Sequence, residues 1–532
     1  MLGRLYLRPM TARTSSAARC LPRCHGRQSR AKLHCVTVNL NLDQLHIPGH
    51  DLTLKRAAID SIAKAKPLRP AARRRPESYN PDDAAVILVS RRLASWLEDN
   101  DFIAQLIKVA GLDLKFSTAE GISILSAAVD EVPRYDSRIN YFASAEGLSV
   151  VCGSSRVLLP NLWDSDTEQT EAVAQPYLEF ELARERQSEW QSRVTVPVAN
   201  TVFSNGKPHV LLASRWEVDG GEHLRLSRRV EKKRQTILTT RVDMQYHGSG
   251  TRVHDSLRCP FVPVTKPRKI VAGLGNILRQ IEIDSEPVPA SKELEAVIPA
   301  LVDLRSRSWE GNVTDSTAAD RPSVWALVFP RLGAGRFAPR SAEPLRLEGY
   351  TPSREWHYAQ RNSTLIHSLM LGGGCQLRKI LSGGGGWGPK QGLLSLDPQT
   401  SLTAHEDQDL ENFIASFEGE DGGPDIFLRP GSYVQFFVEP ISLSYSGRLA
   451  DFHLPWYTTL APTLAIGTSG AAPEHPLDGL AHAWPALFGA VSSKGIYFTH
   501  GKRFGVPPTF ATKLDAAPSY YIASKTIPPA PE

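Results

Sequence analysis

Apolar residues along this chain occur in short runs, spaced as β-strands or amphipathic helices require. Ala85–Val89 is an uninterrupted apolar run of strand length, and Ile122–Val129 and Leu148–Leu159 are further segments that contain strands. Between the first two, Arg91–Ala110 places its large apolar residues near helical spacing. The pattern therefore predicts one amphipathic helix there, stopped by Gly111.

The middle of the chain combines a polar, acid-rich stretch with a predicted hairpin. The composition of residues 166–193 favours a helix. Asn205-Gly206 then separates two apolar runs, Thr195–Phe203 and His209–Trp216. Because both residues of an Asn-Gly pair tolerate positive φ, this pattern predicts a β-hairpin.

Helical and extended patterns alternate in the next part of the chain. Lys269–Ile283 and Ser291–Arg305 both read as helices, the second with Ser291 as its N-cap and glutamates in its first turn. Val324–Phe329 is a predicted strand. A further helix is expected to begin at Thr351-Pro352, since proline at the first helical position loses no hydrogen bond.

A strand at Tyr433–Val438 is predicted beyond the turn residues Pro430-Gly431. Strand side chains alternate, so Phe436 and Val438 should share one face and Phe437 should lie on the other. Helices and strands are interspersed along the chain without a regular βαβ period. The sequence therefore predicts an α+β fold with mixed, mainly antiparallel sheets, interspersed helices and two packed units.

Charge is distributed unevenly. The chain has 532 residues and a formal net charge of +5. Residues 1–42 contain eight basic residues and no acidic one, which leaves −3 for the remainder. An Arg-rich, acid-free N-terminus is typical of a transit peptide, and we expect import into mitochondria, to the matrix. The alternative is a basic tail on a cytosolic or nuclear protein.

A remainder near −3 lacks the general basic character of a nucleic-acid-binding protein. Local basic patches remain at 228–234, with sequence RRVEKKR, and at 69–75, with sequence RPAARRR. A solvated face and a linker are the simpler interpretations of the two.

Five parts are expected along the chain. The prolines and the Arg run between Val36 and Asp82 indicate an extended linker, so we expect folding to begin at Asp83. The Pro/Ala-rich tail is expected to be irregular. The parts are a transit peptide at 1–35, a basic, proline-rich linker at 36–82, an N-terminal α+β unit at 83–345, a Gly-rich C-terminal α+β unit at 346–506, and a tail at 507–532.

Cysteine spacing limits the possible chemistry. Of six cysteines, Cys152, Cys259 and Cys375 lie outside the leader, and each is more than 100 residues from the next. This spacing gives no disulfide framework and no CxxC zinc site, and we expect no metal site. No segment is apolar enough to span a membrane, so a soluble protein is expected.

The most unusual segment is 371–398, LGGGCQLRKILSGGGGWGPKQGLLSLDP, with glycine clusters at 372–374 and 383–386. Glycine loses much backbone entropy on folding, so such clusters need a reason. One reason is an anion nest, in which backbone N–H groups and nearby basic side chains bind a phosphate-bearing ligand. The candidate ligand residues are Gly383, Gly384, Gly385, Gly386 and Lys390. The alternatives are a tight structural turn packed under Trp387 and an interaction loop.

This segment is not a standard P-loop. Gly383 and Gly388 have the spacing of G-x4-G-K-[S/T], but Pro389 stands where the lysine should be and Lys390 where the hydroxyl should be. Proline also removes an N–H donor that the loop needs.

The segment, together with NTVFSNG at 200–206 and GLGNILRQ at 273–280, resembles fungal mitochondrial proteins that share a GGGGWG-x-K-x-GLLSLDP-like segment. The resemblance covers a minority of the chain. It implies a mitochondrial location and no known reaction.

Other catalytic and metal patterns are incomplete. The GLG at 273–275 lacks the third glycine of a dinucleotide fingerprint, because position 278 is leucine. Cys375 follows three glycines, and at a helix start it would be an activated thiol, with His357 and His367 as bases; the alternative is a small buried residue.

The sequence is compatible with three functions. The first is a soluble mitochondrial protein that acts without catalysis as a binding or accessory factor for a protein partner. The second is an enzyme or sensor that binds a small phosphate-bearing ligand through 372–390. The third is an RNA-associated factor of mitochondrial gene expression, for which the patch at 228–234 is the candidate surface.

Overall fold

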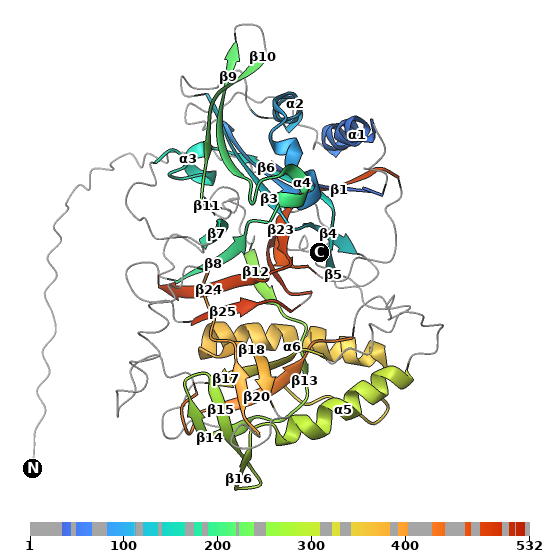
Figure 1. The fold of residues 1–532 in the computed structure, drawn as a ribbon, viewed down its shortest axis with the longest axis vertical. Helices are drawn as coiled ribbons and strands as arrows, with labels where there is room; N and C mark the ends of the chain where they lie inside the picture. The colour runs from blue at the N-terminus through green and yellow to red at the C-terminus, as the bar shows by residue number, and fades with distance from the viewer. Residues whose placement is uncertain are drawn as a thin grey trace, which may run out of the picture.

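Residues 34–526 contain the described parts of the computed structural model, drawn in Figure 1. These parts are 34–43, 49–65, 82–110, 112, 121–136, 141–164, 175–183, 190–219, 223–238, 252–308, 322–329, 342–383, 392–402, 428–441, 463–469, 479–502, 510–516 and 518–526. The fold is α+β with mixed, mainly antiparallel sheets and interspersed helices, as the sequence predicts.

The described N-terminal residues build most of a seven-stranded sheet. Its strands, in spatial order, are β10 (His223–Glu231), β9 (Leu211–Asp219), β3 (Ile122–Val129), β2 (Ala84–Ser90), β6 (Gly147–Gly153), β1 (His34–Leu40) and β22 (Ala481–Pro485). Side chains of β2 alternate between two cores: Val86 and Leu88 enter one, Ile87 and Val89 the other. Burial on both faces explains why this strand is an uninterrupted apolar run.

Helices cover one face of this sheet, as Figure 1 shows for α1 and α2. They are α1 (His50–Ala65), the 3₁₀ helix η1 (Arg91–Leu97) and α2 (Asn100–Ala110). The sequence predicts one helix over 91–110, but the chain breaks at Asp99, whose carboxylate accepts a hydrogen bond from Phe102 N at 3.0 Å. That side chain caps α2, so a second helix begins there.

A closed antiparallel barrel forms the lower half of Figure 1. Its strands, in order around the ring, are β14 (Arg268–Leu274), β15 (Ile277–Ile283), β19 (Leu394–Leu396), β18 (Gln376–Gly383), β17 (Val324–Phe329) and β20 (Tyr433–Val438), which pairs again with β14. The short strands β13 (Val262–Pro263) and β16 (Glu286–Pro289) extend it. Closure leaves the six strands without free edges.

Two long helices lie beside the barrel, α5 (Lys292–Arg307) and α6 (Pro352–Gly373) (Figure 1). Both were predicted, and Thr351 caps α6 by accepting a hydrogen bond from Arg354 N. The strand prediction at 433–438 is also confirmed: Phe436 and Val438 lie in one core and Phe437 in another.

Two further sheets join the seven-stranded sheet to the barrel. One contains β11 (Arg234–Leu238), β7 (Tyr177–Ala183), β8 (Trp190–Pro197), β24 (Ile496–Lys502) and β25 (Phe510–Leu514). The other contains β12 (Arg252–Arg258), β26 (Tyr520–Thr526), β21 (Thr463–Thr468) and β23 (Leu487–Ser492). One continuous core is shared by these sheets and by the outer face of the barrel, with Phe498 and Trp325 among its members.

The linker predicted at 36–82 is wrong where the structure describes it. β1 lies between β6 and β22, and the hydroxyl of Thr37 bonds Ser149 Oγ at 2.8 Å and Leu487 O at 2.9 Å. Helix α1 buries Leu54, Ala58 and Ile62, which recur every four residues. The linker prediction depended on the prolines at 67–81, and these lie outside the described residues.

The irregular tail predicted at 507–532 is also contradicted. β25 and β26 lie in it, and Tyr520, Tyr521 and Ile522 of β26 are buried. The boundary at 345 divides the barrel, because β14, β15 and β17 precede it and β18, β19 and β20 follow it. These segments are strands because each pairs with a strand that is distant in sequence, which local composition does not reveal.

Three predictions of local structure are corrected as well. Lys269–Ile283 is a hairpin rather than a helix, turning at Gly275 with φ 56°. The predicted helical stretch at 166–193 contains strand β7, in which Leu178 and Phe180 alternate with glutamates, and the start of strand β8. The two arms of the predicted Asn-Gly hairpin, β8 and β9, belong to different sheets.

Candidate functional site

The first glycine cluster ends a helix. Gly372 and Gly373 are the last residues of α6, and Gly374 adopts φ 63°, the left-handed conformation of a C-cap. The Cys375 amide then donates to Leu369 O at 3.2 Å. This is a structural termination motif, in which glycine avoids the penalty of a Cβ at positive φ.

The second glycine cluster is described only at its first residue. Gly383 ends β18 in exposed backbone, and a Cβ there would lie 2.3 Å from Leu394 Cδ2. Its φ lies outside the left-handed region. Gly384, Gly385, Gly386 and Lys390 lie outside the described residues, so the ligand role assigned to them stays a prediction.

Two nearby cations are already engaged within the fold. Arg378 is buried and donates to the carbonyl oxygens of Asp397, Pro398 and Gln399 at 3.2–3.4 Å. Burial lowers the pKa of Arg378 to about 10, so it remains charged at neutral pH. Lys379 Nζ lies 3.2 Å from the Asp515 carboxylate. Arg378 thus holds β18 to the segment after β19, and Lys379 joins the barrel to the residue that follows β25.

Cys375 follows a helix rather than starting one. It is 2% exposed, and burial raises its thiol pKa to about 12. The same cause raises the pKa of the Cys259 thiol to about 12. A thiol with so little thiolate is a small buried side chain, not an activated nucleophile.

No group of three or more His, Cys, Asp or Glu side chains within the described ranges is placed to hold a metal ion. The same part of the chain contains no helix whose length and hydropathy would let it cross a membrane.

The Phe203 turn, residues 200–207, is the feature that the sequence did not anticipate. It contains the single-turn helix α4 (Val202–Asn205), which ends at Gly206 with φ 77°. Phe203 is fully exposed and Val202 is 42% exposed. In the hairpin prediction these residues ended a strand, which would have given them sheet neighbours.

Side-chain hydrogen bonds fix this turn at both ends. Thr201 is completely buried, and its hydroxyl donates to Lys207 O at 2.7 Å. Asn200 Oδ1 accepts from Val202 N at 3.0 Å, and Asn205 Oδ1 accepts from Lys207 N at 3.2 Å. The exposed phenyl ring is therefore carried on ordered backbone.

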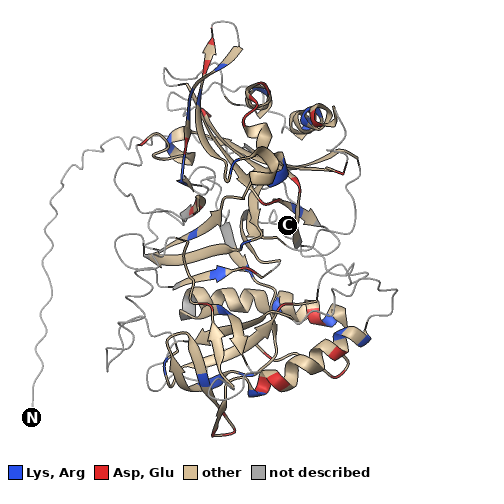
Figure 2. Ribbon diagram, in the orientation of Figure 1, with Lys and Arg blue, Asp and Glu red and all other residues tan. Residues whose placement is uncertain are grey.

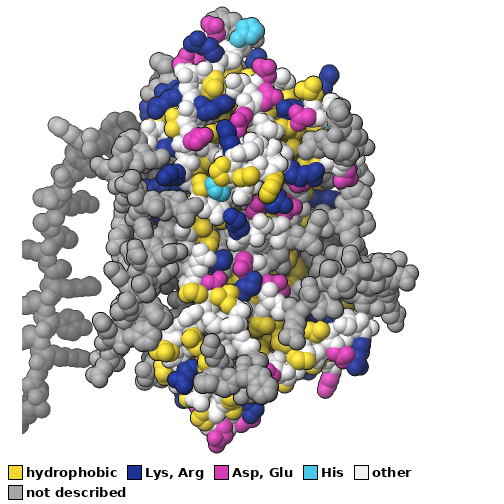
Figure 3. Space-filling model, viewed as in Figure 1, with side chains coloured by type: hydrophobic (Ala, Val, Ile, Leu, Met, Phe, Trp, Pro, Cys, Tyr) yellow, Lys and Arg dark blue, Asp and Glu magenta, His cyan; other side chains and the backbone are white. Residues whose placement is uncertain are grey.

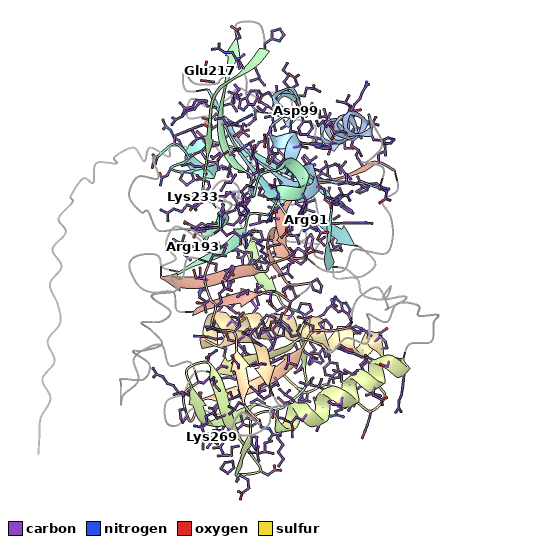
Figure 4. The ribbon with its side chains drawn as sticks, viewed as in Figure 1. Arg91, Asp99, Arg193, Glu217, Lys233 and Lys269 are labelled. Carbon is purple, nitrogen blue, oxygen red and sulfur yellow. The ribbon has the colours of Figure 1, made fainter. Side chains whose placement is uncertain are left out.

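Contacts with η1 anchor the turn to the seven-stranded sheet. Glu98 accepts from Asn205 Nδ2 at 3.1 Å and lies 3.1 Å from Lys207 Nζ. Arg91, labelled in Figure 4, begins η1 and is exposed. The surface around Phe203 is thus apolar at its tip, and at its base the charges of Lys207 and Glu98 are paired with each other.

Comparison of the chain with known protein families, curated proteins and solved structures finds no match.

Proposed function

We propose that this protein is a non-catalytic accessory factor of the mitochondrial matrix, which binds a partner protein through the Phe203 turn. The observation that carries the proposal is a fully exposed phenylalanine, with half-exposed Val202 beside it, on a turn fixed by buried Thr201. An aromatic ring on ordered backbone loses little conformational entropy when it enters a pocket. Such rings are common anchors of protein interfaces.

The chemistry of the turn defines the partner's surface. Phe203 requires an apolar pocket, and the partly exposed Lys207–Glu98 pair at the base of the turn favours polar groups on the rim of that pocket. A protein with such a pocket would bury the ring and contact the polar base of the turn at the same time. This pairing of apolar core and charged rim is the usual anatomy of an interface.

The matrix location rests on the leader. Residues 1–42 carry eight basic and no acidic residues, and a membrane potential acts on such a segment during import. Fusion of residues 1–42 to a reporter should direct the reporter to mitochondria. A cytosolic distribution of the fusion would contradict the location without affecting the Phe203 argument.

Photocrosslinking tests the binding function directly. The full chain with p-benzoylphenylalanine in place of Phe203 should crosslink to one protein in mitochondria. The same replacement at Leu52, which is 70% exposed on α1, is the matched control and should not. Equal crosslinking of the same proteins from both positions would contradict the proposal.

The crosslinked partner then allows a quantitative test. Phe203→Ser should weaken binding of the purified partner by about 30-fold or more, the loss usual for an aromatic anchor. Leu52→Ser should leave the affinity within about twofold, since Leu52 lies outside the proposed surface. An unchanged affinity of Phe203→Ser would rule out the turn as the binding site.

The phosphate-binding alternative has a narrower basis. Arg378 and Lys379, which could have supplied charge to a nest at 372–390, bond protein oxygens instead. The candidates Gly384–Gly386 and Lys390 are outside the described residues. The Phe203 turn is therefore the better supported site.

A further inference from the structure

Two arginines lie opposite each other on neighbouring strands at one edge of the seven-stranded sheet. In the antiparallel pair β9–β10, Arg228 lies directly opposite Arg215 in the register. Residues opposite one another in an antiparallel pair project from the same face, and like charges in such a pair are destabilising. The neighbouring Arg225 on β10 pairs with Glu217 on β9 instead. An anion between Arg215 and Arg228 would relieve the repulsion of the two guanidinium groups.

A tryptophan lies against both guanidinium groups. The Trp163 ring centroid is 4.6 Å from Arg215 Cζ and 5.2 Å from Arg228 Cζ. The indole N–H donates to Ser123 Oγ at 3.0 Å, and Ser123 is the residue opposite Arg215 on β3. The hydrogen bond fixes the ring, and the ring orders the two guanidinium groups by cation–π contact.

The same cluster contains a buried donor. Arg215 Nε is enclosed and has no hydrogen-bond partner among the described residues. Trp163 itself is half-buried, so part of its ring remains accessible. The cluster therefore combines guanidinium donors with an aromatic surface.

Basic side chains continue from this cluster along the chain. Arg228 is followed by Lys233 and Arg234, both exposed, at the junction of β10 and β11. Figure 2 shows basic positions along this part of the chain, and Figure 4 labels Lys233. In Figure 3, Lys and Arg side chains are interspersed with acidic ones over the upper part of the molecule. β10 ends at Glu231 and β11 begins at Arg234 in the five-stranded sheet, so this basic strip, Arg228 to Arg234, runs from one sheet to the next. An anionic ligand matching this strip would be extended.

We propose that Trp163, Arg215 and Arg228 form a binding site for single-stranded RNA, with the basic strip to Arg234 following its phosphate backbone. The two guanidinium groups bind a phosphodiester group, and the accessible part of the indole stacks with an unpaired base. A single phosphate would satisfy the arginine pair but leave the strip unused, and a duplex would not present a free base face.

Fluorescence anisotropy of the full chain tests the site, with a labelled oligouridylate of about 20 nucleotides as probe. Arg228→Ala should weaken binding by about tenfold, and Trp163→Leu by about fivefold or more. The double variant Arg215→Ala/Arg228→Ala should reduce the salt slope of log K by about 0.7, because the two guanidinium groups share one phosphate and each single-strand phosphate contact contributes about that much. Arg228→Lys should restore most of the affinity lost in Arg228→Ala.

Arg229 provides the matched control. It is adjacent in sequence, but it projects from the opposite face and donates to Asn100 Oδ1 at 2.6 Å. Arg229→Ala should leave the affinity within about threefold; a loss equal to that of Arg228→Ala would indicate a general charge effect and overturn the site. Because Arg228 is exposed, its variant should fold, which a thermal melt verifies.

Three other outcomes would overturn the proposal. The first is no binding at about 50 mM salt, where phosphate contacts are strong. The second is equal displacement of the probe by inorganic phosphate at the same phosphate concentration, which would indicate a site for a single anion. The third is Arg228-dependent binding to phosphatidylserine vesicles without RNA binding, which would indicate a lipid surface. Phe203→Ser should not alter RNA binding, so the two sites can fail separately.

Discussion

Single glycines determine how closely the strands of this fold approach one another. A Cβ added at Gly489 on β23 would lie 1.7 Å from Ala465 O on β21, and at Gly467 it would lie 2.4 Å from a carbon of the Tyr520 ring. Gly479 differs, since it has φ 87° and no atom within 4 Å of the place that a Cβ would occupy. Steric and conformational reasons for glycine can therefore be separated by experiment.

Gly489→Ala should lower the free energy of unfolding by about 3 kcal/mol, because a backbone oxygen in a paired strand cannot move away from the methyl group. Urea denaturation measures the change. Gly479→Ala, which meets only the conformational penalty of positive φ, should cost about 1 kcal/mol. Equal midpoints for the two variants would contradict the close approach of β21 and β23.

The buried thiol of Cys375 gives a pH dependence with a defined sign. Its pKa is about 12 in the folded state and about 8.5 in an unfolded chain. The unfolded state loses this proton first, so the contribution to stability is complete below about pH 8.5 and falls as the pH rises towards 12. Cys375→Ala removes that dependence.

Between about pH 8 and pH 10, the wild-type chain should lose about 2 kcal/mol more stability than Cys375→Ala. Denaturation of both proteins at each pH measures this difference, and groups that both proteins share cancel. Parallel curves would show that the thiol is accessible in the folded state.

Residue chemistry was only partly predictable from the sequence. The alternative of a small buried residue is supported for Cys375, whereas the exclusion of a P-loop at 383–390 stays a prediction from the sequence. The bonds of Arg378 to three carbonyls about twenty residues later depend on how β18 and β19 pair. The cluster around Trp163 likewise requires the β9–β10 register, which no local pattern reveals.

At the scale of elements, strands buried on both faces were the easiest to predict. β3 and β17 have the bounds expected from their apolar runs, because burial on both faces leaves few positions for polar residues. The hairpin β14–β15 was mistaken for a helix, since its short charged strands contain apolar residues at spacings compatible with both structures. The Asn205-Gly206 signal correctly indicated a turn but gave no information about which strands would pair.

A buried ion pair connects the elements around the barrel. Glu355 of α6 is fully buried and bonds Arg305 of α5, and Ile441 N donates to the same carboxylate at 2.9 Å. Arg305 also donates to Glu439 O at 2.7 Å, just beyond β20. Two helices and a strand end therefore meet at one carboxylate.

Arg305→Met should destabilise the protein by about 3–5 kcal/mol, because it leaves the Glu355 charge buried without its partner. Arg307→Met is the matched control on the same helix, since its pair with Asp303 is exposed and should contribute less than about 1 kcal/mol. Chemical denaturation measures both variants. Similar losses would show that the Arg305 pair is solvated.

At the scale of the whole molecule, pairing between distant segments decides the organisation. β1 pairs with β22 more than 440 residues later, and β26 pairs with β12 and β21. Composition carries no information about such distant partners. For this reason it predicted an irregular N-terminal linker and an irregular C-terminal tail. The α+β class could be predicted from local patterns, whereas the domain boundaries could not.

The C-terminal strands give the sharpest test of this organisation. A chain ending at residue 506 lacks β25 and β26 and leaves β12, β21 and β24 without these partners. It also removes Tyr520, Tyr521 and Ile522 from the core, each of which contributes roughly 1.5–3 kcal/mol when buried. Their summed loss is comparable to the whole stability of a typical domain, so this truncated chain should not unfold cooperatively.

A chain ending at Thr526 keeps both strands and should melt at the wild-type temperature. Thermal unfolding followed by circular dichroism, with limited proteolysis at room temperature, distinguishes the two chains. A cooperative transition at the wild-type temperature for the chain ending at 506 would contradict the pairing of β26 and restore the irregular tail that its composition predicted.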